Sequence, residues 1–137
     1  MIRITLPPPP SANVYWRTRL SYGSKKPRAV TYRSPEANAY AARVRTLGQL
    51  ARLVPFTGEV VVVIDWYRDR RAGDVDNRIK PLLDALQGLA FVNDNQVRRV
   101  VATRYQAEQA RVDVTVYPWG DRTAATEAAT FFPEAAA

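Results

Sequence analysis

The alternation of apolar and polar residues along the chain predicts four strands. Residues 2–6 alternate as a half-buried strand does, and the prolines at 7–10 end it because proline cannot donate to a strand ladder. Residues 59–68 contain five consecutive β-branched residues, so we expect this strand in the centre of a sheet with both faces covered. Residues 97–105 and 111–117 complete the predicted set.

Two helices are predicted between these strands. Ser34-Pro35-Glu36 is typical of a helix start, with a capping hydroxyl, a proline at the first position and an acid near the positive end of the helix dipole. The second helix is expected at residues 76–88, where apolar residues recur at helical spacing. The order βαβαββ predicts an α+β (mixed α/β) fold, with two helices packed on a mixed sheet.

Length and composition agree with a single globular domain. The chain has 137 residues, 47% of them apolar and 24% charged. We assign residues 1–120 to the domain and residues 121–137, which are rich in Ala and Thr and lack periodicity, to a weakly ordered tail. No apolar run approaches the roughly 20 residues that cross a bilayer, and the start lacks the apolar block of a signal peptide. We therefore expect a cytoplasmic protein with no membrane partner.

The distribution of charge indicates a polyanionic partner. The net charge is +7, and residues 1–58 hold ten Lys or Arg against one acid, whereas residues 59–137 hold ten against twelve. Residues 11–33 are predicted to form a long loop or irregular hairpin in which basic and aromatic residues alternate. The candidate DNA contacts lie there and in the turn after the central strand: Arg17, Arg19, Lys25, Lys26, Arg28, Arg70 and Arg71.

The absence of two residue types limits the chemistry. The chain contains no cysteine and no histidine, which excludes disulfides and every zinc site or catalytic triad that needs either residue. Any acid–base or metal chemistry must therefore use carboxylates, lysine, hydroxyls or tyrosine.

Carboxylates gather after the central strand. Asp74 and Asp76 are two residues apart, so in an extended segment both project on the same side, and hard oxygen ligands of this kind suit Mg²⁺. Lys80 lies one helical turn after Asp76 and is placed to neutralise a phosphate oxygen. If the strand after the second helix returns antiparallel to the central strand, Asp94 completes a three-carboxylate site.

A structural interpretation of the same residues stays open. Asp76 is a natural helix cap, Asp76 and Lys80 can form a surface ion pair, and the segment around Asp94 can be a simple turn. On this interpretation Asp84 is a helix-surface residue. Asp65, inside the central strand, is expected to serve the structure through a hydrogen bond.

Four short segments form a combined motif: Gly73-Asp74-Val75-Asp76-Asn77, Lys80, Leu83-Asp84-Ala85-Leu86 and Asn93-Asp94-Asn95-Gln96-Val97. The chain also opens with the loop Pro10-Ser11-Ala12-Asn13-Val14-Tyr15-Trp16. In both features the sequence resembles the RusA-type Holliday junction resolvases, over residues 1–118.

The resemblance implies a homodimer that nicks four-way DNA junctions in recombination and repair, using Mg²⁺ or Mn²⁺ and no small-molecule cofactor. Asp74, Asp76 and Asp94 would be the metal ligands and Lys80 the catalytic lysine. Members of the family often carry an acid where this chain has Asn93, which we expect to tune the site. The family also makes a prophage origin plausible.

Three other functions stay open on the residues alone. A non-catalytic module that binds branched nucleic acid explains the charge and the aromatic residues, but not the gathered carboxylates. A general branched or flap DNA endonuclease explains both features. A metal-dependent transferase that binds a nucleotide diphosphate is disfavoured, because the chain is short and has no glycine-rich phosphate loop.

Overall fold

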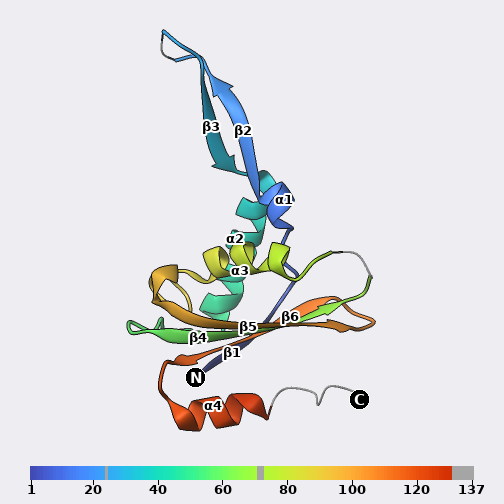
Figure 1. The fold of residues 1–137 in the computed structure, drawn as a ribbon, viewed down its shortest axis with the longest axis vertical. Coiled ribbons are helices and arrows are strands. Elements are labelled where there is room, and N and C mark those ends of the chain that lie inside the picture. The colour runs from blue at the N-terminus through green and yellow to red at the C-terminus, as the bar shows by residue number, and fades with distance from the viewer. Residues whose placement is uncertain (24, 71–72, 131–137) are drawn as a thin grey trace.

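The computed structural model describes residues 1–23, 25–70 and 73–130. Its elements, in chain order, are β1 (Ile2–Leu6), α1 (Ala12–Tyr15), β2 (Trp16–Ser21), β3 (Arg28–Arg33), α2 (Pro35–Leu50), β4 (Val60–Arg68), α3 (Asp76–Leu86), the 3₁₀ turn η1 (Asp94–Gln96), β5 (Val97–Gln106), β6 (Arg111–Pro118) and α4 (Arg122–Ala129). Figure 1 shows a sheet between helices and a long hairpin that projects from this body.

The main sheet is mixed, as the sequence predicts. Its strand order is β1-β6-β4-β5, in which β6 pairs antiparallel with both β1 and β4, while β5 pairs parallel with β4. The first seven residues of β4, Val60 to Trp66, are all buried. The predicted α+β fold with a mixed sheet is therefore confirmed, and so is the central position of residues 59–68.

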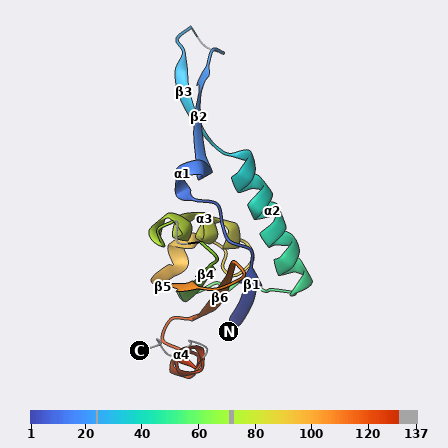
Figure 2. The same cartoon turned by 90° about the vertical axis from the view of Figure 1, so that its right-hand side faces the viewer.

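The two faces of β4 pack against different helices. Val60, Val62 and Ile64 belong to the larger core, which includes residues of α2 and α3. Val61 and Val63 alternate with them, point to the other face and pack with residues of α4. In Figures 1 and 2, α2 and α3 lie on one side of the sheet and α4 on the other. This arrangement explains why a run of β-branched residues without polar alternation is stable at this position.

Helix α4 differs from the predicted weak order of residues 121–137. The carboxylate of Asp121 accepts a hydrogen bond from the backbone N–H of Ala124 and caps the helix, while Ala124 and Ala128 are buried against the sheet. Alanine favours helix strongly but contributes little to an apolar pattern, so the buried stripe is not visible in the sequence. The last part of the predicted tail, residues 131–137, lies outside the described residues.

The predicted loop at residues 11–33 contains a regular hairpin. The short helix α1 leads into β2, and β2 pairs with β3 from Trp16 opposite Arg33 to Ser21 opposite Arg28. Tyr15, at the base of the hairpin, is 2% exposed, and its carbonyl accepts the N–H of Ser34. These elements and α4 are additions to the predicted order βαβαββ. Among the described residues, no helix combines the length and apolarity of a membrane span.

Candidate active site

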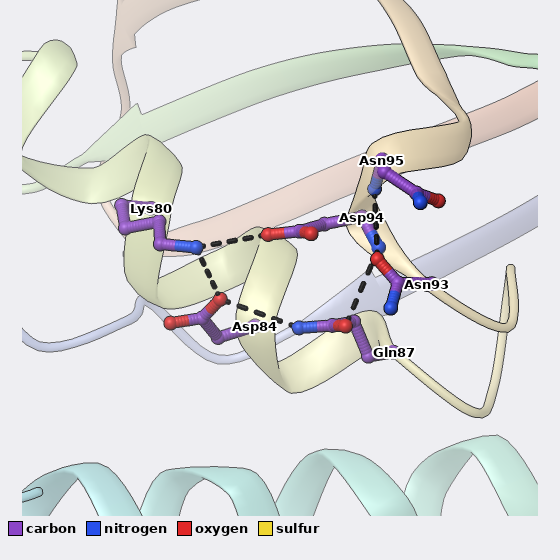
Figure 3. Close-up of polar contacts among 6 residues, drawn as sticks. All are labelled: Lys80, Asp84, Gln87, Asn93, Asp94 and Asn95. Atoms are coloured by element: carbon purple, nitrogen blue, oxygen red, sulfur yellow. Dashed lines mark hydrogen bonds and ion pairs between the residues drawn. The ribbon is translucent and has the colours of Figure 1, made fainter.

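Helix α3 carries two acids and a lysine on one face. Asp76, Lys80 and Asp84 follow one another at four-residue spacing, so they project from the same side of the helix. The ammonium of Lys80 donates to Asp84 Oδ1 at 2.7 Å and to Asp94 Oδ2 at 2.9 Å, as Figure 3 shows. Lys80 therefore joins α3 to the segment before β5. The ion pairs of the described residues do not include Asp76 with Lys80.

Asp94 is positioned by a capping box. The side chain of Asn93 accepts the N–H of Asn95, and the side chain of Gln96 accepts the N–H of Asn93. The amide nitrogen of Gln96 also donates to the carbonyls of Phe56 and Gly58, at 2.8 Å each. The segment around Asp94 is thus a turn, as the structural interpretation proposed, but a turn that holds a carboxylate next to Lys80.

The two carboxylates keep Lys80 protonated. The hydrogen bonds that Lys80 donates to Asp84 and, with a smaller effect, to Asp94 raise the pKa of Lys80 to about 12, against a smaller opposing effect of burial. The side chain is 54% exposed, so a phosphate can approach the ammonium. Lys80 can act there as a permanent cation that stabilises negative charge, rather than as a general base.

Asp74 and Asp76 are both exposed at the start of α3, and no hydrogen bond or ion pair with another described residue holds either carboxylate. The N-cap position belongs to Val75, which makes no side-chain capping bond. The predicted alternative role of Asp76 as a helix cap is therefore wrong. The carboxylate oxygens remain available to a cation.

Gly73 shapes the approach to these acids. Its φ is +102°, and a Cβ built there would lie 3.2 Å from the ring of Trp66, so a side chain is disfavoured by conformation and by space. The guanidinium of Arg68 donates to the Gly73 carbonyl at 3.0 Å and fixes the turn.

The predicted route that brings Asp94 to Asp74 and Asp76 was wrong. β5 runs parallel to β4, because α3 carries the chain back to the edge where β4 begins. Asp94 therefore precedes β5 at one edge of the sheet, while Asp74 follows β4 at the other. Within residues 1–23, 25–70 and 73–130, no three acidic side chains are grouped closely enough to hold a metal ion. The assignment of all three as ligands stays a prediction.

A pocket rich in arginine lies beside the start of α3. It has a volume of about 390 Å³ and is lined by Trp66, Arg68, Arg70 and Arg78, together with Pro8, Asp69 and Ala110. The guanidinium of Arg78 lies 5.3 Å from the centroid of the Trp66 ring and donates to the carbonyl of Pro9. This pocket places positive charge close to Asp74 and Asp76. Of its arginines, the sequence analysis named only Arg70.

Asp84 was wrongly predicted to be a helix-surface residue. Its side chain is 12% exposed and accepts from Lys80 and, at 3.4 Å, from Gln87. It also interacts with Tyr15, whose phenol has a raised pKa. Burial is the largest cause, and the charge and hydrogen bond of Asp84 add to it, while a hydrogen bond with Arg33 acts in the opposite direction. The base of the hairpin therefore contacts the cluster around Lys80. The four-residue spacing from Lys80 was the signal that could have identified Asp84.

Asp65 does not play the predicted role either. It lies on β4 opposite Asp113 of β6, and its buried Oδ1 has no hydrogen-bond partner among the described residues. Burial, followed by the charge of Asp113, raises its pKa to about 6, against an opposing effect of Arg3.

Most of the predicted DNA contacts lie on or near the hairpin. Arg17 and Arg19 are on β2 and Arg28 is on β3, all exposed, with Lys25 and Lys26 in the turn between the strands. Arg70 lines the arginine pocket, and Arg71 lies outside the described residues. The structure thus separates the predicted contacts into two regions, the hairpin and the pocket.

The sequence matches known nucleases over most of its length. The family described as endodeoxyribonuclease RusA matches residues 6–117. The crossover junction endodeoxyribonuclease rusA of Enterobacteria phage HK97 is 34% identical over 97 residues, which are 69% of this chain and 73% of that protein. Together with the exposed carboxylates, the lysine and the arginines, these matches define an enzyme that cuts within DNA strands. The chain belongs to the RusA endodeoxyribonuclease family, as the motif around Asp74 and Asp94 predicted.

Proposed function

We propose that this enzyme resolves four-way DNA junctions by metal-dependent paired nicking. The observation that carries the proposal is the Lys80 ammonium, held by Asp84 and Asp94 one helical turn from the exposed Asp76. The similarity to a phage crossover junction endodeoxyribonuclease supports the choice of a junction over linear duplex DNA.

The donor set fits Mg²⁺ or Mn²⁺. Asp74 and Asp76 offer hard carboxylate oxygens that make no hydrogen bond or ion pair with another described residue. Two carboxylates together with water and a substrate phosphate are a common environment for Mg²⁺. Asp94 is the third candidate ligand, and Lys80, which holds its carboxylate, lies one helical turn from Asp76. The bound ion would polarise the scissile phosphate and lower the pKa of an attacking water.

The protein supplies the remaining charge. Lys80 would donate to a phosphate or leaving oxygen, because its raised pKa keeps it protonated. Arg68, Arg70 and Arg78 would orient the neighbouring phosphates from their pocket. The hairpin would hold a DNA arm through Arg17, Arg19, Lys25, Lys26 and Arg28.

We further propose that the active unit is a homodimer that works on DNA in the cytoplasm. A four-way junction has approximate two-fold symmetry, and a C2 dimer presents two equivalent sites to it. Two nicks placed symmetrically are what such a pair of sites would produce.

The test is cleavage of end-labelled four-way junction, linear duplex and flap DNA, with Mg²⁺ or with EDTA. We expect paired symmetric nicks on the junction alone, lost in EDTA and in Asp76→Asn. The control is Glu108→Gln. Glu108 is an exposed acid in the turn before β6, so this substitution removes one negative charge away from the site, and the variant should cleave as the wild type does.

Two results would change the conclusion. Equal cleavage of flap and junction would make the protein a general branched-DNA endonuclease, a function that the same site also serves. Tight junction binding without product under any divalent ion would contradict the proposal.

A further inference from the structure

A pocket lies on the opposite side of the sheet from α3, where β6 leads into α4. It has a volume of about 210 Å³, large enough for a single nucleobase. Its walls carry two aromatic residues, two arginines and one acid: they are Arg99, Tyr117, Trp119, Gly120, Asp121 and Arg122, with Val61 and Ala125 at the sheet and helix. Trp119 and the whole of α4 lie beyond residues 6–117, the part of the chain that matches the nuclease family.

Trp119 is exposed but fixed. Its side chain is 44% exposed, while its backbone N–H donates to the carbonyl of Glu59 at 2.9 Å. The guanidinium of Arg98 lies 4.6 Å from the centroid of the indole ring and is itself held by Glu59 at 2.7 Å. An indole ordered in this way loses little conformational entropy when a planar group stacks on it.

Two arginines beside Trp119 can bind an anion. Neither Arg99 nor Arg122 forms an ion pair with any residue in the described ranges, and both are exposed. Of the acids around the pocket, Glu59 pairs with Arg98, and the Asp121 carboxylate accepts the N–H of Ala124. Free guanidinium groups beside an exposed aromatic ring are the combination that binds a phosphate and its base.

The pocket lies at the same edge of the sheet as Asp94. Val60, at the start of β4, pairs with Val97 at the start of β5 and with Pro118 at the end of β6. Asp94 comes just before Val97, and Trp119 directly follows Pro118. In Figure 1 the segment before β5 and the start of α4 are found at the same end of the sheet. A DNA strand that passes Lys80 and turns over this edge would meet Trp119 next.

We infer that this pocket binds one unpaired nucleotide of a DNA strand that leaves the cleavage site, with the base stacked on Trp119 and the flanking phosphates on Arg99 and Arg122. This inference rests on the proposed function in one respect only, namely that the bound strand comes from the cleavage site. The pocket is predicted to bind single-stranded DNA whether or not the protein cuts it.

The experiment measures binding of the full chain to a four-way junction, to a duplex with a single-stranded tail and to a blunt duplex, by fluorescence anisotropy in EDTA across a range of KCl. We expect Trp119→Ala to weaken binding of the junction and the tailed duplex by roughly tenfold, with a smaller effect on the blunt duplex. Trp119→Phe should keep most of the affinity because it keeps a ring.

The arginines are tested through salt dependence. Arg99→Gln with Arg122→Gln should make the slope of log affinity against log salt shallower by about 1.4, since each phosphate contact on a single strand contributes about 0.7. Glu127→Gln, exposed on the same helix and outside the pocket, is the control and should bind as the wild type does. Melting curves identify any variant that has lost its fold.

The two proposals fail separately. If the wild type cuts junctions while Trp119→Ala and the double arginine variant bind and cut like it, the pocket inference is overturned alone. If the variants weaken binding as expected but the wild type cuts nothing, the pocket stands and the nuclease proposal falls.

Discussion

Among single residues, Lys80 makes the contacts that tie the site together. Its ammonium holds carboxylates from two segments, Asp84 on α3 and Asp94 before β5. Because both pairs are partly exposed, their contribution to folding stability is small. The larger effect is on geometry, since a lysine fixed by two carboxylates presents its charge at one defined place.

Replacing Lys80 should therefore affect catalysis more than folding. We expect Lys80→Gln to lower the single-turnover cleavage rate by roughly 10²- to 10³-fold, because a preorganised charge on the reacting phosphate is lost. Junction affinity and melting temperature should change little. Single-turnover kinetics and anisotropy on the same samples separate these effects.

Asp84→Asn is the matched comparison. This substitution keeps the shape of the side chain that contacts Lys80 but removes its charge. We therefore expect a smaller decrease in the single-turnover cleavage rate than Lys80→Gln causes. Cleavage by Lys80→Gln at the wild-type rate would contradict the assigned role.

Asp65 makes stability depend on pH. Its pKa is raised from 3.8 to about 6, mainly by burial, so between about pH 4 and pH 6 the folded state keeps a proton that the unfolded chain releases. The contribution of Asp65 to stability therefore falls as pH rises through this window, by up to about 3 kcal/mol. We expect Asp65→Asn to gain stability relative to the wild type between pH 4 and pH 7, as measured by urea unfolding at both values. If the stability difference between Asp65→Asn and the wild type is the same at pH 4 and at pH 7, this prediction is wrong.

Among the elements, the β2–β3 hairpin has two different faces. Cross-strand pairs share a face, so Arg17 with Tyr32, Arg19 with Val30 and Ser21 with Arg28 lie together. The other face carries Trp16, Thr18 and Leu20, opposite Arg33, Thr31 and Ala29. One face of the projecting hairpin is thus markedly basic, which the alternation in the sequence could predict only once the register was known.

The basic face predicts a salt-dependent contact. Replacing Arg17, Arg19 and Arg28 together by Gln should lower the slope of log junction affinity against log salt by about 3, at nearly constant melting temperature. Among the described residues, the ion pair that these changes remove is Arg17 with Glu36 at 3.3 Å, which is exposed and contributes little to stability. An unchanged slope would show that DNA binds elsewhere.

At the scale of the whole molecule, the sheet is stable because helices cover both of its faces. Helix α4 covers Val61 and Val63 with the methyl groups of Ala124 and Ala128, and residues 122–129 are therefore part of the packed fold. Its packing can be tested with two neighbouring alanines, because Ala128 is 2% exposed whereas Ala129 is exposed.

We expect Ala128→Asp to lower the free energy of unfolding by about 3 kcal/mol, since it buries a charge against an apolar face. Ala129→Asp adds the same charge on the exposed side and should be nearly neutral. Urea denaturation measures both variants. Equal stability of the two would mean that the helix does not pack on the sheet in solution.

The sequence by itself determined the family and six of the local elements, namely β1, α2, β4, α3, β5 and β6. Strands and helices follow from the spacing of apolar residues, and β4 was identified as central because a run of β-branched residues requires cover on both faces. The motif around Asp74, Asp76, Lys80 and Asp94 is also local, so it identified the nuclease family without any knowledge of distances.

Only the tertiary structure decided which of these segments meet. Strand pairing depends on how the whole chain packs, and the parallel placement of β5 moved Asp94 to the edge where β4 begins. The same packing brought Asp94 to Lys80, buried the alanines of α4 and placed Trp119 beside Arg99 and Arg122. Periodicity reports which face of an element is apolar, but it carries no information on what covers that face, and for this reason these contacts could not be read from the sequence.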